Sequence, residues 1–338
     1  MKAVVLGSGG WGTALALVLC ANGHDVTLWS HNPAKAAALQ ESRVNPLLKG
    51  VRLPDALQIS GDISCVRDAD LVVFAPPSYA MRDISSKAAP FLQGDVVLVS
   101  VAKGVERDTN LRMSQIIREV TGDRFPVAAL SGPSHAEEVA LQMPTGCVVA
   151  CTDEKAARLV QDAFMNEVFR LYTSEDVVGV EFSGALKNVV ALSCGICDGM
   201  GFQDNTKALL MTRAMAELAR LGEALGGDRR TYGGLAGMGD LIVTCTSMHS
   251  RNRRAGILIG QGLSVREAME QVGGVVEGYY AAESVKQLAA RKGLEMPICS
   301  CAYEVLYQGK PVREVATELM TRARKGEHDS DNWVYPQE

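Results

Sequence analysis

The sequence lacks the bulk features of a nucleic-acid-binding or membrane-embedded protein. Its 34 Lys and Arg residues are balanced by 39 Asp and Glu residues, which leaves a formal net charge of -5. Any anion site must therefore be a local cluster of cations. We expect no apolar run long enough to cross a bilayer, and we expect no signal peptide because a strand pattern follows Met1 directly. The sequence predicts a cytoplasmic protein without nucleic-acid or membrane partners.

The sequence also lacks the ligand pairs of a metal site and the composition of a disulfide framework. Most of its nine cysteines stand singly in apolar segments, which is typical of buried thiols, and its five histidines show no paired spacing. Cys194 and Cys197 have CxxC spacing. A zinc site would need two further ligands, and a redox motif would need a thioredoxin-like context. We expect no metal, and the role of this pair stays open.

The length of 338 residues is too great for one small core and suggests two domains. Strand and helix patterns alternate up to Tyr172, after which only helical periodicity remains. We predict an α/β fold with a first domain over 1–175 in which strands and helices alternate. An all-α domain would follow over 176–325, for which the residues described below predict the substrate and catalytic role, and a loose polar tail over 326–338.

The N-terminal segment carries the pattern of a dinucleotide-binding turn. A strand is predicted over 2–7, a helix over 13–19 and a second strand over 25–29, with G-x-G-x-x-G between the first two. Its glycines allow a tight turn and a close approach of the backbone to a pyrophosphate, beside a helix N-terminus. We therefore predict that the domain 1–175 is a Rossmann-like dinucleotide-binding domain. The candidate cofactor residues here are Gly7, Gly9, Gly10, Trp11 and Gly12.

The end of the second strand bears on the choice between NAD and NADP. An acidic residue at this place usually binds the ribose hydroxyls of NAD, but the chain reads Ser30-His31-Asn32-Pro33. His31 could donate to a 2′-phosphate, or it could be an exposed loop residue. We predict that the chain accepts both cofactors.

Further strands are predicted over 70–77, 95–104, 126–130, 145–151 and 168–172, with a short strand in the excursion 45–61. Ligands of open α/β sheets lie at the carboxyl ends of the strands. Lys103 follows such an end and is well placed to meet an anion or the nicotinamide. His135 follows another, either as a catalytic base or as a packed loop residue.

The helical half contains a lysine in a mostly apolar segment. Helices are predicted over 181–199, 206–225, 253–259, 264–272, 281–292 and 297–306. Lys187 lies in the first of them. If it is buried, desolvation lowers its pKa toward values useful for proton transfer; otherwise its stem covers apolar surface and its amine reaches water. Asp240, in the glycine-rich loop 233–241, is either its partner or a helix cap.

A cationic cluster follows at Ser250-Arg251-Asn252-Arg253-Arg254, where Ser250 is the expected N-cap of a helix. Cations in a first helical turn oppose the helix dipole unless an anion lies among them. The planar guanidinium suits a phosphate. The alternative is a solvated run of charges.

Seven motifs together resemble the bacterial NAD(P)-dependent glycerol-3-phosphate dehydrogenases over nearly the whole chain. They lie at 7–16, 102–104, 131–133, 184–189, 237–241, 250–254 and 275–278. The resemblance implies a fold like that of 6-phosphogluconate dehydrogenase, reduction of dihydroxyacetone phosphate to sn-glycerol 3-phosphate, phospholipid-precursor synthesis in the cytoplasm, and a homodimer.

The resemblance also assigns roles to individual positions. It implies that Lys187 exchanges the proton. The implied substrate contacts are Lys103, Gly132, Ser134, Asp240, Ser250, Arg251 and Asn252, and the implied cofactor contacts are Gly10, Trp11, His31, Lys103, Ala136, Arg251, Val275 and Glu277. Ser134 stands where threonine is expected to be common, and both supply a hydroxyl.

The mechanism predicted from these residues is hydride transfer to the ketone carbon, with Lys187 delivering a proton to the alkoxide. Asp240 and Asn188 would hold Lys187. Two alternatives remain: a related β-hydroxyacid dehydrogenase, which would prefer a carboxylate substrate and would not need the 250–254 cluster, and a non-catalytic NAD(P)-sensing module, which would not need Lys187 and Asp240 together.

Overall fold

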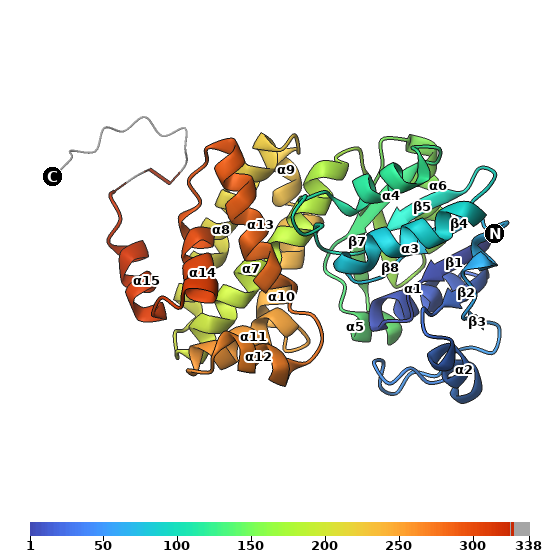
Figure 1. The fold of residues 1–338 in the computed structure, drawn as a ribbon, viewed down its shortest axis with the longest axis horizontal. Helices are drawn as coiled ribbons and strands as arrows, with labels where there is room; N and C mark the ends of the chain where they lie inside the picture. The colour runs from blue at the N-terminus through green and yellow to red at the C-terminus, as the bar shows by residue number, and fades with distance from the viewer. Residues whose placement is uncertain (325, 328–338) are drawn as a thin grey trace.

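The computed structural model describes residues 1–324, 326 and 327, and it has two lobes (Figure 1). In the first lobe, β1 (Lys2–Leu6), α1 (Gly10–Ala21) and β2 (Asp25–Trp29) form the expected βαβ unit. The other strands of its sheet are β3 (Gln58–Ser60), β4 (Leu71–Phe74), β5 (Val97–Ser100), β6 (Val127–Ser131), β7 (Thr145–Ala150) and β8 (Phe169–Ser174). They confirm the predicted strands, including the short one in the excursion.

The sheet order is β3-β2-β1-β4-β5-β6-β7-β8, and every neighbouring pair is parallel except β6 with β7. Both faces of the central strands are covered, which explains why β1 and β4 are almost entirely apolar and buried. Along β1, Ala3 and Val5 belong to one apolar cluster, whereas Val4 and Leu6 belong to another. The helices and 3-10 turns of this lobe are α2 (Pro33–Ser42), η1 (Ile63–Val66), η2 (Ser78–Ala80), α3 (Met81–Ala88), η3 (Ala89–Phe91), α4 (Met113–Thr121), α5 (Ala136–Ala140) and α6 (Glu154–Phe164).

The second lobe is helical and is built around α7 (Val177–Gly199), which begins three residues after β8 ends. The first lobe is thus a Rossmann-like sheet with helices, and an all-helical C-terminal domain follows it, as predicted. The helices after α7 are α8 (Asp204–Ala224), α9 (Arg229–Tyr232), α10 (Asp240–Thr246), α11 (Arg251–Gly260), α12 (Val265–Val272), α13 (Glu277–Lys292), α14 (Pro297–Gln308) and α15 (Val312–Met320).

The expectation about membrane-length runs is wrong for α7. Among the described residues, this helix alone is long and apolar enough to span a bilayer by length and composition. Its apolar surface is instead covered by other helices, and 94% of its most apolar window is buried inside the protein. Because a core helix passes the same test as a membrane span, α7 is explained by its packing.

A further difference concerns the glycine-rich stretch before α10. The glycine-rich stretch 233–241 is not an open loop, because Leu235–Gly239 forms a π-helical turn that leads directly into α10. Asp240 is therefore the first residue of a helix. Most of the predicted polar tail, 326–338, lies outside the described residues.

Glycines let α7 and α11 pack with their backbones in contact. A Cβ on Gly256 of α11 would collide with the carbonyl oxygen of Leu192 in α7, and a Cβ on Gly195 with that of Arg253. Small residues permit such an approach. The crossing places the start of α11 beside the turn of α7 that carries Lys187 and Asn188.

Candidate active site

Lys187 is buried at the middle of α7, with 2% of its surface exposed. Its Nζ lies 3.1 Å from Asp240 Oδ1 and donates to Thr244 Oγ1, whose hydroxyl in turn donates to the carbonyl oxygen of Asp240 at 2.6 Å. The predicted contact with Asp240 is therefore present. Burial lowers the pKa of Lys187 to about 8, and the carboxylate of Asp240 limits the decrease.

Asp240 is shared between two lysines from different lobes. Its Oδ2 lies 2.8 Å from Nζ of Lys103, which follows β5 in the Rossmann-like lobe. Lys103 also donates to the carbonyl oxygen of Gly132 at 2.9 Å, and its Nζ lies 3.4 Å from Ser134 Oγ. Two ammonium groups with one carboxylate leave one net positive charge, which suits an anionic substrate.

Asn188 does not hold Lys187, and the predicted contact is wrong. Its side-chain amide donates to the carbonyl oxygen of Ala185 and accepts from Asn252 Nδ2 at 2.9 Å. Asn252 Oδ1 accepts from the backbone N–H of Gly278 at 2.8 Å. The helix period explains the difference, since consecutive residues of a helix point about 100° apart. Asn188 joins α7 to α11 and α13 instead.

Two arginines at the start of α11 differ in their environment: Arg253 is paired with a carboxylate, whereas Arg251 is exposed. Ser250 caps the helix as predicted, because its side chain accepts from the backbone N–H of Arg253. Arg253 has an anion of its own: its Nε lies 2.8 Å from Asp198 Oδ2, and Lys207 pairs with the same carboxylate at 2.7 Å. Arg251 is exposed and lies against Gly274. Arg251, unlike Arg253, therefore has a guanidinium open to a ligand.

The glycine turn fits the pyrophosphate of a dinucleotide. Gly9 caps α1 without a side chain, and a Cβ placed on it would meet nothing within 4 Å. A Cβ on Gly12 would collide with the carbonyl oxygen of Gly7, so this glycine allows the close packing of helix on strand. The space beside Gly9 thus lies at the N-terminus of α1, where the first N–H groups of a helix have no partner within the helix. These are the requirements for binding phosphates.

The remaining predicted cofactor residues lie along both lobes. A Cβ on Gly10 would be 3.5 Å from Ala136 Cβ, so these two positions adjoin. Glu277 begins α13 and accepts from Ser78 Oγ of the Rossmann-like lobe at 2.9 Å. Burial raises its pKa. The half-buried Val275 precedes Glu277 by two residues, whereas His31 is exposed at the end of β2.

His135 is not among the groups that contact Lys187. Its Nε2 lies 3.4 Å from the carbonyl oxygen of Val243, and its ring centroid is 5.6 Å from that of His249. Burial lowers the pKa of His135. These contacts favour the packing role over the catalytic one.

Thr244 was not foreseen from the sequence. It lies one helical turn after Asp240, so the two side chains share a face of α10. The four-residue spacing of Asp240 and Thr244 is visible in the sequence. It indicates a shared face only if 240–246 is a helix, and we expected Asp240 to lie in a loop.

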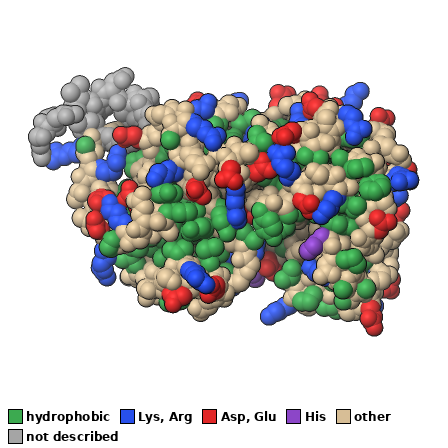
Figure 2. Space-filling view, viewed as in Figure 1, with side chains coloured by type: hydrophobic (Ala, Val, Ile, Leu, Met, Phe, Trp, Pro, Cys, Tyr) green, Lys and Arg blue, Asp and Glu red, His purple; other side chains and the backbone are tan. Residues whose placement is uncertain are grey.

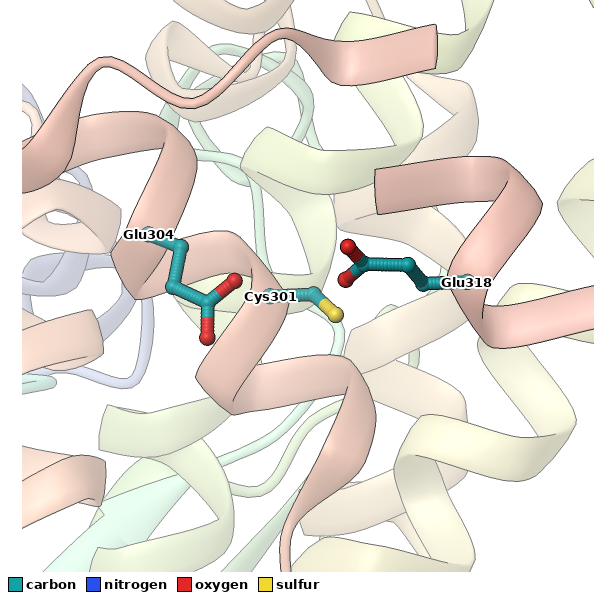
Figure 3. A group of neighbouring side chains, drawn as sticks. All are labelled: Cys301, Glu304 and Glu318. Atoms are coloured by element: carbon teal, nitrogen blue, oxygen red, sulfur yellow. The ribbon is translucent and has the colours of Figure 1, made fainter. Parts of the chain in front are cut away.

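Among the residues that the structure describes, one group of potential metal ligands occurs, between α14 and α15 of the helical lobe. Cys301, Glu304 and Glu318 point toward one another there (Figure 3). The ammonium of Lys310 lies 2.9 Å from Glu304 and 2.6 Å from Glu318, so the two carboxylates already have a cation. Burial raises the pKa of Cys301 to about 11 and disfavours the thiolate that a metal requires.

Known protein families match both lobes. The N-terminal model of NAD-dependent glycerol-3-phosphate dehydrogenase matches residues 2–157, and its C-terminal model matches residues 176–317. The chain belongs to this family. It is 51% identical over 331 residues to the glycerol-3-phosphate dehydrogenase [NAD(P)+] of Moorella thermoacetica, covering 97% of this chain and 98% of that protein. The protein of the same name from Thermoanaerobacter is 50% identical over 328 residues, covering 97% and 99%.

Solved structures agree with the family assignment. The glycerol-3-phosphate dehydrogenase of Coxiella burnetii superimposes with a TM-score of 0.90 at 32% identity, covering 95% of this chain and 99% of that one. A ketopantoate reductase from Ralstonia eutropha has a TM-score of 0.62 at 18% identity, covering 95% and 100%, and shares the fold alone.

Proposed function

We propose that the chain reduces dihydroxyacetone phosphate to sn-glycerol 3-phosphate with NADH or NADPH. The observation that carries this proposal is the buried Lys187, paired with a carboxylate that also binds Lys103 of the other lobe. Family membership supports the substrate, and the exposed Arg251 at a capped helix start supports its phosphate. The glycine turn supports the dinucleotide.

The proton would come from Lys187. When bound, the reduced nicotinamide would supply a hydride to the ketone carbon, and the carbonyl oxygen would take up the electron pair of the C=O bond as an alkoxide. Lys187, protonated at its Nζ, stabilises the developing negative charge and transfers one proton to the oxygen, leaving a neutral amine. Asp240 keeps the ammonium in place, and Lys103 orients the substrate. Gly132, Ser134, Ser250 and Asn252 remain proposed substrate contacts.

The direct test is the loss of absorbance of NADH or NADPH when dihydroxyacetone phosphate is added. We expect turnover with both cofactors, and we expect little with a 2-ketoacid of similar size. A preference for the 2-ketoacid would replace this proposal with a β-hydroxyacid dehydrogenase. Cofactor binding without consumption in either assay would indicate a sensing module.

The role of Lys187 has its own test. Lys187→Met keeps the apolar stem and removes the amine, so we expect kcat to fall by about 10²-fold or more, the usual contribution of general acid catalysis. Titration of NADH should give an unchanged Kd. Turnover near that of the unaltered enzyme would refute the assignment.

We also propose a wider setting for the protein. The Rossmann domain would comprise 1–175, the helical domain 176–325 and a tail 326–338. The protein would act in the cytoplasm as a homodimer and supply a precursor of glycerophospholipids. Sedimentation velocity at micromolar concentration tests the dimer, and a single species of monomer mass would contradict it.

A further inference from the structure

The rim of the glycine turn holds a lysine that the assigned site does not use. Lys35, in the first turns of α2, reaches back across the β2–α2 connection and donates from its Nζ to the carbonyl oxygen of Ser8 at 2.9 Å. The hydroxyl of Ser8 donates to Ser30 Oγ at 2.9 Å. Ser8, between the first two glycines of the turn, therefore contacts both α2, through Lys35, and the residue after β2, Ser30.

This point is where the adenine ribose of a dinucleotide lies in Rossmann domains, beside the end of the second strand. An acid there selects NAD by binding the ribose hydroxyls and repels a 2′-phosphate. Here β2 is followed by the buried Ser30 and the exposed His31. Asn32 uses its side-chain oxygen to cap α2, accepting from Ala34 and Lys35 backbone N–H groups.

Lys35 has the chemistry that a 2′-phosphate needs. An ammonium has three donors, and Ser8 accepts one of them. Partial burial lowers the pKa of the Lys35 ammonium. The four-carbon stem of a lysine is flexible, so the ammonium can move toward a ligand. Arg43, at the end of the same helix, donates instead to the carbonyl oxygens of Pro54 and Leu57. The guanidinium of Arg43 is thus used in hydrogen bonds to the backbone, whereas the ammonium of Lys35 has donors left for a phosphate.

We propose that Lys35 binds the 2′-phosphate of NADP and is the residue that lets this chain use NADPH beside NADH. Without that phosphate, the ammonium rests on the Ser8 carbonyl oxygen. With it, the ammonium exchanges this neutral acceptor for a charged one, which forms a stronger hydrogen bond. His31 can add a second donor from the same connection.

The test compares binding of NADPH and NADH by nicotinamide fluorescence to the full chain and to Lys35→Gln. Glutamine keeps a donor for Ser8 and removes the charge. We expect the Kd of NADPH to rise about tenfold, the loss of one charge-assisted hydrogen bond, and the Kd of NADH to change less than about twofold. Lys35→Arg should retain most NADPH binding. Lys155→Gln removes an exposed charge from α6 of the same lobe and should change neither Kd.

The outcomes separate Lys35 from the dinucleotide site on which the proposal rests. An equal loss for both cofactors would assign Lys35 to support of the glycine turn and overturn the proposal, as would no change for either. Calorimetry with adenosine 2′,5′-bisphosphate against ADP isolates the 2′-phosphate without any catalysis. Failure of the unaltered chain to bind any of these nucleotides would refute the dinucleotide site itself.

Discussion

Lys187 titrates under opposing influences that the surrounding residues set. Burial lowers its pKa, the carboxylate of Asp240 raises it, and the ammonium of Lys103 lowers it again, with a result of about 8. A proton-transfer group is most effective when its pKa lies near the working pH. The shared carboxylate is thus both an anchor for the amine and the group that adjusts its acidity.

The pH dependence of the reaction follows from this value. Ketone reduction needs the protonated amine, so kcat/KM should be constant below about pH 8 and fall above it; the reverse oxidation should rise toward the same pH. Asp240→Asn removes the carboxylate that favours the charged form, so the fall should begin at lower pH. Steady-state rates from about pH 6 to about pH 10 measure both effects. Asp162→Asn, on the exposed face of α6, is the control.

Arg251 offers a second prediction at the residue scale. Arg251→Ala should raise the KM for dihydroxyacetone phosphate by about tenfold or more, because it removes a charged donor to the phosphate. The rate with unphosphorylated dihydroxyacetone should change little. The Kd of NADH is measured in parallel, because Arg251 is also a proposed cofactor contact. Equal losses with both ketones would remove the phosphate role.

At the scale of elements, the site depends on how closely α11 crosses α7. Gly195 and Gly199 of α7 face Gly256 and Gly260 of α11, and a Cβ on any of the four would collide with the backbone of the other helix. Asn252 then reaches Asn188 and Gly278, so the crossing fixes α13 as well. A separation of these helices would move the 250–252 segment away from Lys187.

Gly256→Ala should therefore damage stability and binding together. Its methyl group would meet the carbonyl oxygen of Leu192, which cannot rotate away, and overpacking of this kind costs about 1–3 kcal/mol. We expect a lower unfolding temperature by calorimetry and a higher KM for the phosphorylated ketone. Gly233→Ala is the matched control, because its Cβ would lie 3.6 Å from the nearest atom at a helical φ of -82°. Equal stabilities of the two variants would contradict the packing argument.

At the scale of the whole molecule, contacts between the lobes lie on several elements. Lys103 meets Asp240, Ser78 meets Glu277, and Asn110 donates to Gln287 at 2.7 Å. Figure 2 shows the two lobes side by side, with basic and acidic side chains interspersed over the visible face. Glu181, in the second turn of α7, forms a largely buried ion pair across the junction of the lobes, 2.6 Å from Arg112 before α4. It also accepts from the backbone N–H and hydroxyl of Ser114.

Glu181→Ala should destabilise the junction of the lobes. It leaves the partly buried guanidinium of Arg112 without its carboxylate, and breaking a buried pair costs about 3 kcal/mol. Chemical denaturation followed by tryptophan fluorescence measures the change. Glu154→Ala removes an exposed ion pair to Arg158 and should cost less than about 1 kcal/mol. A similar small effect at both positions would mean that Glu181 does not join the lobes energetically.

The order of elements and the location of most candidate residues were determined by the sequence itself. Its apolar strand runs required a sheet covered on both faces, the glycine turn required a helix packed directly on β1, and the loss of strand patterns after Tyr172 required a helical second half. These features are local, so periodicity and turn chemistry reveal them.

Contacts between distant segments were decided by the tertiary structure alone. Residues 240–246 form a helix in the folded protein, and Thr244 of this helix accepts a hydrogen bond from Lys187. Arg253 forms an ion pair with Asp198. Asn188 contacts Asn252 rather than Lys187. The apolar helix α7, which is long enough to span a membrane, is buried inside the protein. Each outcome depends on which helix packs against α7, and residues separated by 50 or more positions meet there for reasons of shape and charge that no local pattern contains.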